Sequence, residues 1–282
     1  MRLAALVAYD GTGFKGFQRQ APGRGRTAQG ELEAALLRLT GEAILVEGAG
    51  RTDSGVHASG QVITFSSAAS HSEATWLRAL NALLPADVAA RAVRRVDDGV
   101  HARKSALARS YRYRILCDPV RDPLRERYAW RSAERLLGEH DFGAFGSSPR
   151  DNRAEGYRGH TVRTMLQAEC AWRMAETVET ADVQPDEVEC RFTANAFLTG
   201  MVRRLVGALA LVGVGRLSVD DFQRILESRA KAHPGVLAPA QGLCLTGVHY
   251  PAGLIDWAGA DVTDEIDEIN GINGASAGEP GA

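Results

Sequence analysis

The chain has 282 residues, and its 45% hydrophobic and 24% charged content is ordinary for a soluble enzyme. No apolar run approaches the roughly 20 residues of a membrane span, and the apolar start is too short for a signal peptide. We therefore expect a cytoplasmic protein without membrane contact. Four scattered cysteines predict neither a zinc site nor a disulfide framework, and we expect all to be reduced: Cys117, Cys170, Cys190 and Cys244.

The formal net charge is −2, but residues 1–253 are modestly basic. The acidic balance comes from residues 254–282, which hold seven acids and no Lys or Arg. Without that segment, 33 basic side chains stand against 28 acidic ones, a net charge of +5. Of the 33 basic residues, 30 are arginine, which suits bidentate phosphate contacts and stacking on bases. A G+C-rich genome produces the same bias, so the count is compatible with nucleic-acid binding without establishing it.

The first hundred residues predict short strands interleaved with two helices. We expect strands at 2–9, 44–48, 61–65 and 88–95, and helices at 28–39 and 73–83. The short connections favour an α+β unit, in which helices cover one face of a mainly antiparallel sheet.

A similar order follows in the second half. We expect strands at 110–115, 165–172, 188–193 and 243–250, and helices at 134–142, 198–212 and 219–227. This predicts an N-terminal half at 1–105, a C-terminal half at 106–253 and an acidic disordered tail at 254–282. Residues 146–159 predict a mobile loop. Its arginines, with Arg163 nearby, either bind RNA phosphate or stay solvated: Arg150, Arg153 and Arg158.

Asp53 lies between Arg51 and Gly55, shortly before the apolar run 61–65. A loop that enters a rigid sheet can hold an exposed carboxylate in place for catalysis. The alternative is a structural turn in which Gly55 supplies a positive φ. A second loop, with Gly11 and Gly13, lacks the third glycine of a nucleotide-binding turn, so we reject a nucleotide cofactor.

Residues 50–62, GRTDSGVHASGQV, closely resemble the active-site motif of the TruA family of tRNA pseudouridine synthases, with Ser54 where alanine is more usual. Further matches keep the family order at 9–20, 27–36, 102–106, 109–113, 140–145, 192–207 and 238–245. The resemblance implies the pseudouridine synthase fold: two ferredoxin-like (RRM-like) halves, a joined, mainly antiparallel sheet and a central basic cleft.

The resemblance also implies an activity, that of a tRNA pseudouridine(38–40) synthase. This isomerase converts uridine to pseudouridine in the anticodon stem-loop of tRNA, as a homodimer and without a cofactor or metal. Asp53 matches the family's catalytic Asp. The reaction breaks the bond from C1′ to N1, turns the base and joins C1′ to C5, so it requires a carboxylate that acts as nucleophile or base.

A buried carboxylate needs a cationic partner to stay ionised at neutral pH. Arg203 is the candidate, because it lies in a mostly apolar predicted helix and the family pairs an arginine at this position with the catalytic Asp. The alternative is that Arg203 snorkels from the helix end. Arg204 is expected to face outward.

Three residues are substrate-binding candidates by resemblance. Tyr111 is placed to stack on the flipped uracil, although Tyr113 shares its strand face. Arg51 is expected to help extrude or replace the target base. Leu245 either lines the pocket or packs in the core, and His57 orders the loop rather than acting in catalysis.

Two other functions compete with this one. The first is a tRNA-binding chaperone or scaffold without catalysis, against which the joint presence of Asp53, Tyr111 and Arg203 argues. The second is a synthase for another tRNA position or another RNA.

Overall fold

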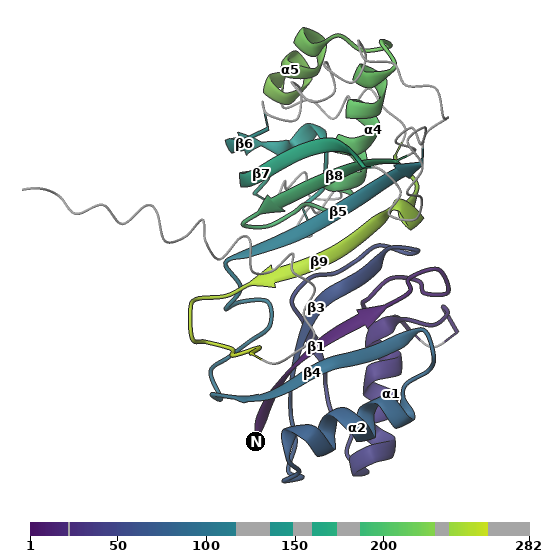
Figure 1. The fold of residues 1–282 in the computed structure, drawn as a ribbon, viewed down its shortest axis with the longest axis vertical. Coiled ribbons are helices and arrows are strands. Elements are labelled where there is room, and N and C mark those ends of the chain that lie inside the picture. The colour runs from purple at the N-terminus through teal and green to yellow at the C-terminus, as the bar shows by residue number, and fades with distance from the viewer. Residues whose placement is uncertain (22, 117–135, 149–159, 174–186, 229–236, 259–282) are drawn as a thin grey trace, which may run out of the picture. The chain divides into compact units, whose positions relative to one another are not determined.

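The structure is a computed structural model that describes residues 1–21, 23–116, 136–148, 160–173, 187–228 and 237–258 (Figure 1). The chain folds into two compact units. Unit 1 contains 1–52, 57–107 and the segment from 245 onward, and unit 2 contains 53–56 and 108–244. Residues 53–56 therefore fold with the second half of the chain, although their sequence neighbours belong to unit 1.

Unit 1 is an antiparallel sheet with two helices. Its elements are β1 (Arg2–Tyr9), α1 (Ala28–Thr40), β2 (Glu47–Gly48), β3 (His57–Ser66), α2 (Glu73–Leu83), β4 (Val88–Val96) and the larger part of β9 (Leu243–His249). The strand order is β4-β1-β3-β9, and β2 also pairs with β3. Strand β1 is antiparallel to both β3 and β4, which confirms the predicted α+β unit with a mainly antiparallel sheet.

Both helices of unit 1 begin at a hydroxyl side chain that caps them. Thr27 accepts from the Gly30 N–H and Ser72 from the Thr75 N–H, each at 3.2 Å. Each cap satisfies an amide that the helix itself leaves without a partner, and contributes about 1 kcal/mol. Helix α1 ends at Gly41, whose φ of 74° suits glycine.

One face of the unit 1 sheet packs against the helices. Phe65 of β3 meets Trp76 of α2, with ring centroids 5.6 Å apart. Trp76 is fully buried, and Leu32 and Leu36 of α1 are almost so. Leu3 is the β1 partner of Phe65 and lies on the same face, because strand residues alternate between faces.

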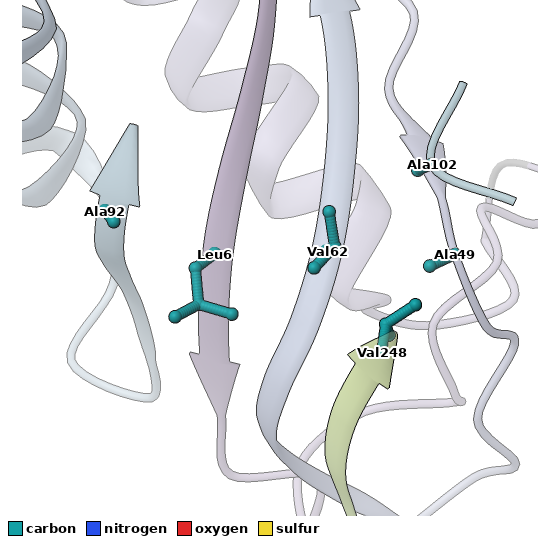
Figure 2. Packing of buried hydrophobic residues seen from close by; sticks show 6 residues of the cluster. All are labelled: Leu6, Ala49, Val62, Ala92, Ala102 and Val248. Carbon is teal, nitrogen blue, oxygen red and sulfur yellow. The ribbon is translucent and has the colours of Figure 1, made fainter. Parts of the chain in front are cut away.

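The opposite face carries a second apolar cluster (Figure 2). Its members come from four strands and two neighbouring segments: Leu6, Val62, Ala92, Val248, Ala49 and Ala102. Ile255 and Trp257 pack against it, and Arg94 donates to the carbonyls of Asp256 and Ala258 at 2.8 and 2.7 Å. The first residues of the predicted tail therefore belong to the packing of unit 1, whereas 259–282 lies outside the described residues.

Unit 2 also combines antiparallel strands with helices. Its elements are β5 (Ala108–Leu116), β6 (Gly138–Asp141), β7 (Val162–Arg173), β8 (Glu187–Ala194), α4 (Met201–Gly213) and α5 (Val219–Ser228), with 3-10 turns at Phe142–Ala144 and Ala240–Gly242. The strand order is β5-β8-β7-β6 (Figure 1). Phe145 packs on Phe222 of α5, with ring centroids 5.7 Å apart, and both side chains are fully buried.

The helix predicted at 134–142 is wrong over its described part. Residues 138–141 form β6, which pairs antiparallel with β7, and 142–144 form a single 3-10 turn. Gly138 has a φ of 92°, which a right-handed helix does not allow. The strand predicted at 44–48 also shortens to β2, while β3 begins at His57, earlier than predicted. The other expected helices and strands are confirmed to within three residues at each end.

The expectation that all cysteines are reduced is corrected for one pair. Cys170 of β7 and Cys190 of β8 form a disulfide, because the register of these adjacent strands places them directly opposite each other. Cys244 is not part of this disulfide, and Cys117 lies outside the described residues.

Most of the predicted mobile loop, including Arg150, Arg153 and Arg158, lies outside the described residues. Arg163, at the start of β7, is described. Its Nη1 donates to the carbonyls of His160 and Val162, and burial lowers the pKa of its guanidinium. Within the described part of the chain, the helices are too short or too polar to cross a membrane.

Candidate active site

The residues that precede Asp53 are held by buried polar groups of unit 1. The Gln61 amide donates to the Gly50 carbonyl at 2.7 Å and accepts from the Gly50 N–H at 3.2 Å. Thr52 shares a hydrogen bond of 2.8 Å with the Tyr9 hydroxyl, and its carbonyl accepts from the Phe17 N–H. Gln61 is fully buried, so these bonds offset the cost of removing its amide from water.

Asp53 opens a tight turn that belongs to unit 2. The Val56 N–H donates to the Asp53 carbonyl at 3.2 Å. Gly55 has a φ of 80°, the positive value that belongs to the structural-turn alternative of the sequence prediction. A Cβ on Gly55 would lie 3.1 Å from the Ala240 Cβ, so a side chain here would crowd Ala240 as well as strain the backbone.

The structure brings Asp53 and Arg203 together. Nη1 of Arg203 lies 3.5 Å from Oδ2 of Asp53, a long charged hydrogen bond. The Arg203 side chain is 14% exposed and that of Asp53 is 33% exposed. Arg203 is therefore mostly buried beside the acid and does not snorkel into solvent, whereas the carboxylate remains open to a reactant on one side.

A second hydrogen bond fixes the direction of the Arg203 guanidinium. Its Nε donates to the Ala238 carbonyl at 2.6 Å, and the Arg203 carbonyl accepts from the Ala238 N–H at 3.2 Å. The planar guanidinium is thus held at Nε by unit 2 backbone while Nη1 faces Asp53. Because Nε and Nη1 are both held, the guanidinium has little freedom to rotate.

Tyr111 and Tyr113 lie on one face of β5, as the sequence predicts. Tyr111 is 8% exposed and meets Phe197 edge to face, with ring centroids 5.0 Å apart. The Tyr113 hydroxyl donates to the Pro239 carbonyl at 2.8 Å. The hydroxyl of Tyr113 is thus committed to the backbone beside Arg203, so the two tyrosines have different surroundings.

The remaining sequence candidates belong to unit 1. Arg51 is exposed, directly before the anchored Thr52. Leu245 on β9 is fully buried, which fits core packing. His57 accepts from the Gly11 N–H through Nδ1 at 3.1 Å, and the same nitrogen lies 3.1 Å from Oδ1 of Asp10, so it orders the neighbouring loop.

Arg204 does not simply face outward. It donates to the carbonyls of Thr199 and Phe145 at 3.0 and 3.4 Å, and so ties the start of α4 to its surroundings. Sequence reasoning also gave no role to the segment Ala238–Gly242. Its Pro and Gly residues, next to a predicted strand, are typical of a fixed turn and were the available signal.

The arrangement combines a partly open carboxylate, a guanidinium held at two points and a glycine turn that fixes the acid. Such a carboxylate can attack a carbon or remove a proton. The guanidinium stabilises its negative charge at close range.

The sequence was also compared with known proteins. Residues 5–103 and 132–251 match the family described as tRNA pseudouridine synthase. A protein of Chloroflexus aurantiacus named tRNA pseudouridine synthase A is 43% identical over 267 residues, which covers 90% of this chain and 91% of the relative. Proteins of the same name from Solidesulfovibrio magneticus and Neisseria gonorrhoeae are 40% and 39% identical, over 89% of this chain and 92% of each relative. The chain therefore belongs to the tRNA pseudouridine synthase family.

Proposed function

We propose that this protein converts uridine to pseudouridine in the anticodon stem-loop of tRNA, with Asp53 as the catalytic carboxylate. Membership of the family makes the chain an isomerase that acts on tRNA. The observation that carries the proposed role of Asp53 is its contact with Arg203, from a helix far along the chain, while the anticodon stem-loop is proposed by resemblance. Two charged residues so distant in sequence meet here in an arrangement suited to the reaction.

The other candidates take supporting roles in this proposal. Tyr111 stacks on the flipped uracil, Arg51 fills the space that the base leaves, and Leu245 contributes an apolar wall. The isomerisation involves no net oxidation or reduction, and we propose that neither a metal nor a cofactor takes part. By resemblance, we propose a cytoplasmic homodimer.

We also propose that each half is ferredoxin-like. The strand order of unit 1 supports this, since β4-β1-β3 with β2 on the far side of β3 is the order that a split βαβ repeat produces. The joined sheet and central basic cleft that the resemblance implies are part of the same proposal.

The test is pseudouridine mapping of an unmodified tRNA transcript with uridines in the anticodon arm, without metal or nucleotide. We expect pseudouridine with wild-type protein and none with Asp53→Asn, which keeps the shape and removes the charge. Asp98→Asn is the matched control, because Asp98 is exposed in a turn. If wild type binds the transcript but leaves all uridines unchanged, the result favours a tRNA-binding chaperone or a synthase for another RNA site. If Asp53→Asn is active, Asp53 is not the catalytic residue.

A further inference from the structure

The segment Ala238–Gly242 touches several parts of the candidate site in unit 2. Ala238 exchanges two hydrogen bonds with Arg203, at 2.6 and 3.2 Å. The Ala240 Cβ lies 3.1 Å from the ideal Cβ position of Gly55, in the turn that carries Asp53. One short segment therefore contacts both the acid-bearing turn and the arginine.

Tyr113 holds this segment from the other side. Its hydroxyl donates to the Pro239 carbonyl at 2.8 Å, and its side chain is buried. A Cβ on Gly242 would lie 2.6 Å from the Tyr113 Cζ and 2.8 Å from the Arg114 carbonyl oxygen. The tyrosine ring thus occupies the space over Gly242 while its hydroxyl fixes Pro239, so Tyr113 contacts the segment at two residues.

The Tyr113 hydroxyl stays protonated and can therefore donate its hydrogen bond at neutral pH. Burial raises its pKa above the ordinary value of 10.0, while the nearby charge of Arg203 acts in the opposite direction. The hydroxyl consequently keeps its proton at neutral pH.

We propose that Tyr113 is a positioning residue for the reaction: it holds Pro239, so that the adjoining Ala238 carbonyl receives Arg203 Nε and the guanidinium stays directed at Asp53. This inference rests on the proposed function and deepens it. It gives Tyr113 a role different from the stacking role proposed for Tyr111. Tyr113 acts through Arg203, without contact to the uridine.

The first test compares Tyr113→Phe with Tyr250→Phe on the same tRNA transcript. The Tyr250 hydroxyl also donates to a backbone carbonyl, that of Ala102 at 2.7 Å, but in unit 1. Both variants lose one such bond, so we expect similar falls in melting temperature. Only Tyr113→Phe is expected to lower kcat, by about tenfold with KM unchanged, the factor that corresponds to one hydrogen bond of ordinary strength. Equal kcat values for the two variants overturn the inference.

A double-mutant cycle supplies the second test. Arg203→Lys removes the Nε–H that Ala238 receives, so its effect on kcat and that of Tyr113→Phe should be far from additive. Gly242→Ala reaches the same contact if Tyr113→Phe folds poorly, because the added Cβ displaces the Tyr113 ring and with it the hydroxyl that donates to Pro239. Gly242→Ala is likewise expected to lower kcat with KM unchanged.

The outcomes separate the inference from the proposed function. Additive effects in the cycle, or wild-type kcat in both Tyr113→Phe and Gly242→Ala, overturn the positioning role while wild-type pseudouridine formation stands. Absence of pseudouridine with the wild-type protein overturns the proposed function, and the inference with it.

Discussion

Gly55→Ala is the change that tests most directly how the turn that carries Asp53 is built. The φ of 80° costs a residue with a side chain about 1–2 kcal/mol. The new Cβ would lie 3.1 Å from the Ala240 Cβ, inside the optimal carbon–carbon separation of about 3.5–4.0 Å. Ala240 or the turn must therefore shift by a few tenths of an ångström.

That shift moves Asp53 relative to its reactant. A misplacement of about 1 Å can cost roughly 100-fold in rate, so a few tenths of an ångström correspond to about fivefold to tenfold in kcat. The backbone cost lowers the melting temperature by about 2–4 °C for each kcal/mol in a chain of this size. Both quantities are measured on the same preparations, by thermal unfolding and by single-turnover assay on the tRNA transcript.

Gly41→Ala is the matched control. Gly41 has a φ of 74° at the end of α1, and a Cβ there would have open space around it. We expect the same loss of stability as in Gly55→Ala, with unchanged kcat. If Gly55→Ala keeps the wild-type kcat, or if Gly41→Ala loses as much activity, the turn does not position the acid as argued here.

Three further predictions concern unit 1. Deletion of 254–282 should cost about 2–4 kcal/mol in unfolding free energy, because the packing of Ile255 and Trp257 is lost. Deletion of 259–282 should leave the unfolding free energy unchanged in denaturant titrations, and equal effects of the two deletions would contradict the role of that packing. Gln61→Leu should lower stability by about 1–3 kcal/mol, because the loop backbone loses both hydrogen bonds, and wild-type stability would contradict this. Burial lowers the pKa of His249 in the folded state. As the pH falls through about 6.5, His249 of the unfolded state therefore binds a proton more readily than His249 of the folded state. Stability should be full above that pH and decline below it, and His249→Gln should flatten the decline more than His160→Gln does at an exposed site.

Local sequence signals account for most of the elements. Helices α1 and α2 are predictable because Thr27 and Ser72 cap apolar patterns of helical period. The helix predicted at 134–142 fails because Gly138 takes a positive φ and the chain pairs with β7. Pairing with a strand more than twenty residues later leaves no local signal, since backbone hydrogen bonds do not depend on side-chain type.

The contacts that define the site are of the same long-range kind. The apolar pattern around Arg203 predicted that its charge needs a partner, whereas the choice of Asp53, 150 residues away, was expected from family resemblance. The disulfide between Cys170 and Cys190 depends on the register of β7 and β8. The hydrogen bond from Tyr113 to Pro239 joins residues 126 positions apart, which no local sequence pattern predicts.

The discontinuous make-up of unit 2 bears on how this protein can be taken apart or recombined. Its main segment, 108–244, includes Arg203, whereas Asp53 belongs to the separate four-residue segment 53–56. A fragment cut at residue 107 would separate carboxylate from arginine, and a chimera that exchanges only 108–244 would pair an arginine from one parent with an acid from the other. In a chimera made from two relatives, residues 53–56 and 108–244 should therefore come from the same parent.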